Sequence, residues 1–232
     1  MDFSNFFSTD MLLNIVIIAI PALICITIHE LSHGYAAYRL GDNTAKDMGR
    51  LTLNPIKHID IVGLIMILVV GFGWAKPVPV NMQNFKHPKW HMAMTAIAGP
   101  LSNIILAVIL LFIFMLLPAP YGGISALDGV YFSAAPNLLA MIFSRMALLS
   151  IVLSFFNMLP IPPLDGSKVL FSLLPTKYYN KVLQYERFGM ILVIALLFSS
   201  RFLNFDFFST IIIEPAFKLL IWISIFFHNL LG

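Results

Sequence analysis

The first long apolar run of the chain constrains its fold more than any other feature. It covers residues 11–38, MLLNIVIIAIPALICITIHELSHGYAAY. That length exceeds the roughly 20 residues that an α-helix needs to cross about 30 Å of hydrocarbon. The whole chain is 59% hydrophobic and 11% charged, which is far from the balance of a soluble domain. The sequence therefore predicts an integral membrane protein whose core is a helical bundle in lipid.

Five stretches have the length and composition of spanning helices. They are residues 11–38, 92–117, 137–158, 186–204 and 207–229. A sixth apolar run, at residues 59–74, is short for a span and is interrupted by three glycines. Its Ile and Val content suits extended structure, so it could contain a small β-hairpin. We predict an all-α polytopic membrane protein with about five transmembrane helices and one short segment that re-enters the membrane or crosses it.

Basic residues indicate the orientation of this bundle. The N-terminal tail has Asp2 and Asp10 but no Lys or Arg, whereas residues 39–58 carry four basic side chains. Cytoplasmic loops are enriched in Lys and Arg, so we expect the N-terminus outside and residues 39–58 in the cytoplasm. The loops on both sides of residues 59–74 are basic, which favours re-entry over crossing.

The first apolar run ends in HELSH, residues 29–33. On a helix, His29 and His33 project from one face, so both imidazoles can reach a single ion, and Glu30 can hold a water beside it. An ionised side chain at the middle of a membrane helix costs about 2.5–3.5 kcal/mol, which favours a use for these groups. The alternative is that they are ordinary polar residues at the cytoplasmic end of the helix.

A catalytic zinc ion keeps three protein ligands and one open position, so a third ligand is needed. NMLPIPPLDG, residues 157–166, contains Asp165 in a proline-rich segment that cannot remain helical. An Asp-Gly pair alone is typical of a turn. With five spans, however, the helix at 137–158 runs inward and delivers Asp165 to the end of the membrane that holds His29. The topology from basic loops and the requirement for a shared metal therefore agree.

Three motifs in this order resemble the site-2 protease family of intramembrane zinc metalloproteases. They are HELSH at 29–33, GPLSN at 99–103 and NMLPIPPLDG at 157–166. Two more stretches, GRLTLNP at 49–55 and WAKPVPVN at 74–81, are similar to the small bacterial members that lack a PDZ domain.

The resemblance implies that His29, His33 and Asp165 bind one Zn²⁺ ion and that Glu30 is the catalytic base. It implies a substrate that is a transmembrane helix of another membrane protein in the lipid bilayer, and a bacterial cytoplasmic membrane as the location. Together with the basic loops, it places the active site near the cytoplasmic face. We expect one integral membrane protease domain over residues 1–232, with a catalytic core at about 11–170 and C-terminal helices at 186–229.

Four further residues have roles that the sequence does not decide. Asn103 and Asn157 could bind the substrate backbone or the tetrahedral intermediate, or they could form hydrogen bonds between helices, which average about 0.6 kcal/mol in membranes. Gly99 is expected to permit close helix contact, and His58 is expected to be an interfacial group. The sequence leaves these readings open.

A membrane zinc transporter or metal-binding protein is the alternative function, because intramembrane His and acidic residues also mark ion paths. A transporter would be expected to hold its ligands near the midplane, between repeated halves, and the sequence has no such repeat. Binding of nucleic acid is excluded because the net charge of +3 is spread over separate loops. The sequence does not decide whether copies of the chain form a homo-oligomer.

Overall fold

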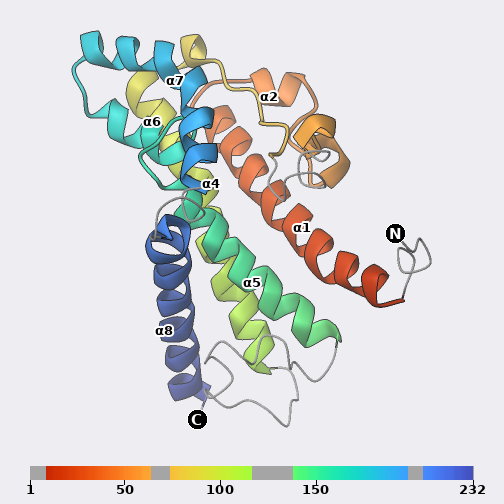
Figure 1. The fold of residues 1–232 in the computed structure, drawn as a ribbon. Coiled ribbons are helices and arrows are strands. Elements are labelled where there is room, and N and C mark those ends of the chain that lie inside the picture. Colours follow the sequence, from red (N-terminus) through yellow and green to blue (C-terminus); the bar gives the residue numbers. More distant parts are fainter. Residues whose placement is uncertain (1–8, 64–73, 117–137, 198–205, 232) are drawn as a thin grey trace, which may run out of the picture.

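The computed structural model describes residues 9–63, 74–116, 138–197 and 206–231. Four long helices dominate these residues: α1 (Thr9–Arg39), α4 (Pro88–Leu116), α5 (Leu138–Asn157) and α8 (Glu214–Leu231). Helix α4 packs against the other three, while α1 and α5 run in one direction and α4 and α8 in the other (Figure 1). The described residues contain no strand.

The buried face of each long helix follows helical spacing. In α1, the side chains of Ile17, Cys25, His29 and His33 are buried and lie at multiples of four residues from one another, so they form one stripe along the helix. The same stripe that begins in the apolar core therefore ends in the two histidines. The core itself lies between α1, α4, α5 and α8. It is formed by Cys25, Ala107, Leu110, Leu111, Met146, Ala147, Ile151, Ala216, Leu220, Ile223 and Phe227.

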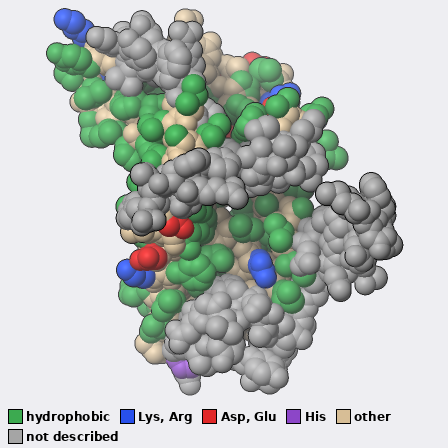
Figure 2. All heavy atoms as spheres, viewed as in Figure 1, with side chains coloured by type: hydrophobic (Ala, Val, Ile, Leu, Met, Phe, Trp, Pro, Cys, Tyr) green, Lys and Arg blue, Asp and Glu red, His purple; other side chains and the backbone are tan. Residues whose placement is uncertain are grey.

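Three of the described helices are long and apolar enough to cross a membrane: Ile17–Arg39, Pro88–Leu116 and Ser209–Leu230. The last of these begins with a π-helical turn, η7 (Ser209–Ile213), that continues into α8. The apolar helix Met141–Asn157 within α5 is shorter. Hydrophobic side chains cover most of the described surface seen in Figure 2, and charged side chains there are few and scattered. Both observations fit an integral membrane protein.

The expected spans at 92–117, 137–158 and 207–229 correspond to α4, α5 and η7 with α8. The stretch at 186–204 begins inside α7 (Thr176–Leu197), and its remainder lies outside the described residues. The same holds for most of the run at 59–74 and its expected hairpin. The described part of that run, residues 59–63, ends in helical conformation.

Short elements gather at one end of the bundle, where α1 ends and α4 begins (Figure 1). They are α2 (Thr44–Asp47), η2 (Pro55–His58), η3 (Met82–Asn84), α6 (Asp165–Ser172) and α7. Helix α1 stops at Arg39, two residues before Gly41, whose φ of 107° suits the left-handed C-terminal conformation that glycine adopts readily.

Asp42 links the loop after α1 to the segment that precedes α4 through hydrogen bonds. Its side chain is fully buried and accepts hydrogen bonds from Thr44 N, Thr44 Oγ1, Asn81 N and Asn84 Nδ2. Burial alone would raise the pKa of Asp42, but the hydrogen bonds from Thr44, Asn81 and Asn84 lower it below its ordinary value. The charged carboxylate therefore stabilises the end of the bundle that contains the site described next.

Candidate metal centre

Three potential ligand atoms converge at this end of the bundle. Nε2 of His29 lies 3.0 Å from Nε2 of His33, and Oδ2 of Asp165 lies 3.1 Å from each of them. The histidines come from the buried stripe of α1, and Asp165 is the first residue of α6. All three side chains are buried. The structure thus brings together the three residues that the sequence indicated as ligands, although Asp165 is 136 residues from His29.

The hydrogen bond of His33 fixes which of its nitrogens can bind a metal. Nδ1 lies 2.7 Å from the carbonyl oxygen of Thr95. A carbonyl only accepts, so Nδ1 carries the proton and Nε2 presents its lone pair. A metal-binding imidazole is usually held in this way through its second nitrogen. The Thr95 carbonyl therefore orients His33 toward the centre of the three ligand atoms.

Asn103 gives His29 a corresponding partner. Its amide Nδ2 lies 3.3 Å from Nδ1 of His29, while its Oδ1 is buried without a hydrogen bond. A half-turn of the amide exchanges the two atoms, and Oδ1 then accepts a hydrogen bond from the Nδ1–H of His29. The unsatisfied oxygen is thus explained if Nε2 of His29 is a metal ligand, because Nδ1 must then carry the proton.

Gly99 leaves the space that the two imidazoles occupy. A Cβ at this position would lie 2.5 Å from Cε1 of His33 and 2.8 Å from Cε1 of His29. No side chain fits there, so the expected role of Gly99 in close helix contact can be stated more specifically: it admits the histidine rings.

The dimensions of the cluster fit a zinc ion. Zn–N and Zn–O bonds of about 2.0–2.1 Å in tetrahedral geometry place neighbouring ligand atoms about 3.3 Å apart. The separations of 3.0–3.1 Å in the cluster lie close to this value. Two nitrogens and one carboxylate oxygen are also the donor set of many catalytic zinc sites, which keep the fourth position open.

Glu30 lies beside the cluster and is held by one hydrogen bond. The backbone N–H of Val78 donates to Oε2 of Glu30 at 2.8 Å. Among the described residues, no second hydrogen bond to the Glu30 carboxylate is present. Its other oxygen, Oε1, can therefore accept a proton.

A cavity of about 470 Å³ opens onto these groups. His29 and Glu30 line it, together with residues of the 55–60 loop, residues 74–77, the end of α5, and α6. Such a volume is typical of a pocket for a small ligand or a short peptide segment. Asn157 also lines the cavity, and its Nδ2 donates to the carbonyl of Leu153, one turn earlier in α5. The structure thus places Asn103 behind a histidine and Asn157 on the cavity wall.

Lys168 is a further charged residue in this wall. Its Nζ lies 3.8 Å from Oδ1 of Asp165, the carboxylate oxygen on the side away from the histidines. Burial alone would raise the pKa of Asp165, but without a metal the hydrogen bonds from His29 and His33 and the positive charge of these imidazoles hold it well below its usual range. Asp165 is therefore a carboxylate, as a metal ligand must be.

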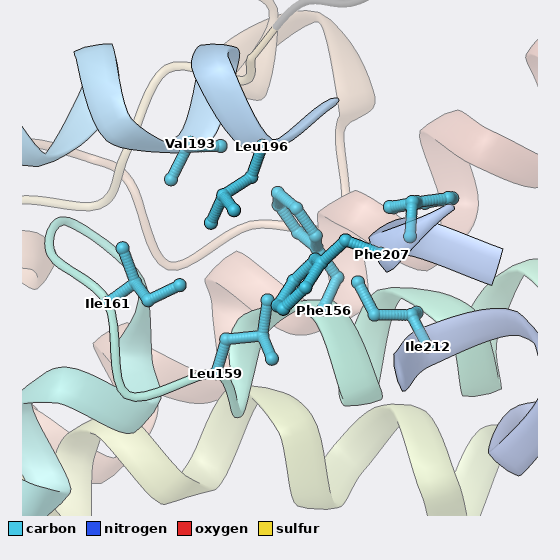
Figure 3. A pocket seen from close by; sticks show the side chains of 8 residues that line it. Phe156, Leu159, Ile161, Val193, Leu196, Phe207 and Ile212 are labelled. Atoms are coloured by element: carbon cyan, nitrogen blue, oxygen red, sulfur yellow. The ribbon is translucent and has the colours of Figure 1, made fainter. Parts of the chain in front are cut away.

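A much smaller apolar pocket of about 10 Å³ adjoins the large cavity. The side chains of Phe156, Leu159, Ile161, Val193 and Phe207 point into it (Figure 3). Its volume is about that of one probe sphere, and an apolar space of this size stays dry. Phe156 and Val193 line both spaces, so these two side chains, from α5 and α7, form a shared apolar wall.

Sequence reasoning missed three features of the site. His58, expected at an interface, is 2% exposed and lines the cavity. Lys168 and Val78 were not recognised. The signal for Lys168 was its position one helical turn after Asp165, whereas Val78 contributes a backbone group, which no residue pattern identifies directly.

A membrane-type helical bundle that buries two histidines and an aspartate around one point, with a glutamate facing a cavity beside them, defines the class of zinc-dependent membrane hydrolases. The family model of peptidase family M50 matches residues 16–200. The chain is 45% identical over 179 residues to YwhC of Bacillus subtilis strain 168, which is named as a zinc metalloprotease; the match covers 77% of this chain and 78% of that protein.

Two mycobacterial proteins named Rip2, also as zinc metalloproteases, are more distant. The protein of Mycolicibacterium smegmatis is 26% identical over 75% of this chain and 64% of its own length. The protein of Mycobacterium tuberculosis H37Rv is 28% identical over 82% of this chain and 69% of its own length. No solved structure matches the chain.

The chain belongs to peptidase family M50. It is an intramembrane zinc metalloprotease, and the predictions of the site-2 protease family, of enzyme class and of zinc as cofactor are confirmed. Neither the family nor the named relatives support the alternative of a zinc transporter.

Proposed function

We propose that this protein hydrolyses peptide bonds within or near transmembrane segments of other membrane proteins, with His29, His33 and Asp165 as zinc ligands and Glu30 as catalytic base. One observation carries the proposal: the three ligand atoms lie within 3.1 Å of one another, beside a cavity that Glu30 also lines. When bound, zinc polarises the scissile carbonyl and lowers the pKa of a bound water toward about 7.

Glu30 performs the proton transfers in this scheme. Its free Oε1 takes a proton from the attacking water, and the same carboxylate later passes that proton to the leaving amine. Asp165, His29 and His33 would hold the ion, and the contacts of Thr95 with His33 and of Asn103 with His29 would keep the two imidazoles oriented for this role.

The substrate proposed here is a membrane-embedded helix. Its carbonyls are hydrogen-bonded within the helix, so it must unwind locally before attack. A cavity of about 470 Å³ accommodates a few extended residues rather than a helix of about 10 Å diameter. Asn157 on the cavity wall is proposed to contact the substrate backbone, whereas the contact of Asn103 with His29 supports a role in orienting that ligand.

For the membrane arrangement we propose five spans with the N-terminus outside and the active site near the face of the bacterial cytoplasmic membrane that meets the cytoplasm. The parallel direction of α1 and α5 (Figure 1) supports this topology, because both helices then end on the side of the basic loops. Residues 1–232 form one protease domain in this proposal, with its core at 11–170. All proposed catalytic groups come from a single chain, so a homo-oligomer is compatible but not required.

The test is zinc content and cleavage of a panel of single-span membrane proteins, measured for purified native protein and for two pairs of variants. Glu30→Gln should keep about one zinc per chain and lose cleavage, while its control Glu214→Gln, at an exposed position, should keep both. Asp165→Ala should lose or weaken zinc and lose cleavage, while its control Asp47→Ala, also exposed, should not.

Retained cleavage in Glu30→Gln would exclude Glu30 as the base. Native zinc affinity in Asp165→Ala would exclude Asp165 as a ligand. If the native protein in liposomes transported zinc and cleaved none of the panel, the proposed reaction itself would be wrong.

A further inference from the structure

The segment KPVP, residues 76–79, presents a single hydrogen-bond donor to Glu30. Proline has no backbone N–H, so Val78 carries the one N–H among Pro77, Val78 and Pro79. The segment is outside regular secondary structure, and proline on either side disfavours a helical conformation there. The Val78 N–H therefore has no partner in its own segment, and it donates to Oε2 of Glu30 at 2.8 Å.

Several contacts hold this segment in place beside α1. Lys76 N donates to the carbonyl of His58 at 2.9 Å, and Nη2 of the buried Arg50 donates to the carbonyl of Lys76 at 2.8 Å. The side chain of Val78 is itself 7% exposed. These contacts fix both the backbone before Val78 and the side chain of Val78.

Gly34 supplies the close approach between this segment and α1. It lies one helical turn after Glu30, and a Cβ there would come within 2.9 Å of Cγ1 of Val78. The absence of a side chain at Gly34 thus lets Val78 lie against the helix at the level of the proposed base. The distance between segment and helix is set by packing rather than by the Glu30 hydrogen bond alone.

We propose that the backbone N–H of Val78 is a positioning group for Glu30, an inference that rests on the proposed role of Glu30 as base. A carboxylate on a helix side chain can rotate freely unless one oxygen is held. The charge-assisted bond to Oε2 removes that freedom and leaves Oε1 to take the proton of the attacking water. Trp74, Ala75 and Pro77 of the same segment line the cavity, so the wall that contacts the substrate also holds the base.

The test is the variant Val78→Pro, which deletes the N–H and keeps an extended backbone. Misplacement of a catalytic group by about 1 Å can cost about 100-fold in rate, so we expect kcat to fall by about 10- to 100-fold, with about one zinc per chain and KM within about twofold of native. Val78→Thr keeps the backbone N–H and the branched shape but adds a buried hydroxyl, so its kcat should stay well above that of Val78→Pro.

Val80→Pro is the matched control for a third proline in the segment, because the Val80 N–H bonds to no described residue. It should leave kcat unchanged. Native kcat in Val78→Pro, or an equal loss in Val80→Pro, would overturn the inference. If Val78→Pro fails to accumulate, replacing the Val78 amide by an ester removes the same N–H with the side chain intact, and the same kcat criterion applies.

Glu30→Gln in the same assay separates this inference from the proposed function. If Glu30→Gln still cleaves, the assignment of the base is wrong and the positioning role falls with it. If Glu30→Gln is inactive while Val78→Pro has native kcat, the base assignment stands and only the positioning role is wrong.

Discussion

Replacing Gly99 by alanine tests the metal centre without touching any proposed ligand. The added Cβ would lie 2.5 Å from Cε1 of His33 and 2.8 Å from Cε1 of His29. Carbon atoms in contact are usually about 3.5–4.0 Å apart, so the rings and α4 must separate by about 1 Å. The change is favourable for helix formation itself, since alanine is the better helix former, and the expected defect is therefore local.

The expected loss of zinc affinity follows from how little zinc–ligand distances can vary. Zinc sites keep their ligand distances within about 0.2 Å, and the required displacement is about five times larger. Removing a residue that only orients a ligand typically costs about 10- to 100-fold in metal affinity. Displacing two proposed ligands directly should reduce zinc affinity at least as much as the larger of these two losses. We therefore expect zinc affinity to fall by about 100-fold or more, with loss of cleavage.

The assay is a zinc competition titration against a chelating dye, with thermal unfolding as a check on the fold. Gly34→Ala is the control, because it makes the same substitution in the same bundle. Its Cβ would meet the ends of the Leu51 and Val78 side chains, so zinc should be retained, although kcat should fall if Val78 positions Glu30. Native zinc affinity in Gly99→Ala would refute the packing argument, and so would an equal loss of zinc in Gly34→Ala.

Asn103→Leu should weaken zinc binding about 10- to 100-fold in the same titration, because it removes the amide that orients His29; unchanged affinity would exclude that role. Asp42→Asn should lower stability by about 1–3 kcal/mol by mispairing buried donors, read as a lower melting temperature. Because the folded pKa of Asp42 is lowered, its contribution is complete above its unfolded pKa and is lost as the pH falls through its folded pKa. Acidification should therefore destabilise the native protein more than Asp42→Asn, and parallel losses would contradict this. Lys168→Met should change zinc affinity by less than about fivefold, since a partly exposed ion pair contributes little; complete loss of zinc would show that Lys168 supports Asp165 more strongly than its distance suggests.

The grouping of His29, His33 and Asp165 could be predicted because it depends on local rules and on topology. The spacing of His29 and His33 is fixed by the helix, and Asp165 follows from the direction in which the third predicted span crosses the membrane. The role of Val78 could not be predicted in this way. It is 48 residues from Glu30 and acts through a backbone N–H, and the contact requires the tertiary placement of residues 74–81.

The helices also differ in how well the sequence predicts them. Hydropathy located α4 and α5 to within a few residues, because lipid exposure makes these helices apolar along most of their length. It placed the start of the next helix at residue 186, whereas α7 begins at Thr176. The first turns of α7 are rich in Lys, Tyr and Asn, and a helix that begins outside hydrocarbon has no apolar run to mark it.

The histidines of HELSH and the residues of α4 form one packed unit, and this explains a motif that sequence reasoning could only partly interpret. Thr95, Gly99 and Asn103 are spaced by four residues, so they lie on one face of α4. Thr95 contacts His33, Asn103 contacts His29, and Gly99 lies against both rings, as the antiparallel direction of α1 and α4 requires. A rotation of α4 by one residue, about 100°, would remove all three contacts together. The GPLSN motif, together with Thr95 one turn earlier, is thus the complement of HELSH: Gly99 provides the space, and Asn103 and the Thr95 carbonyl orient the two rings.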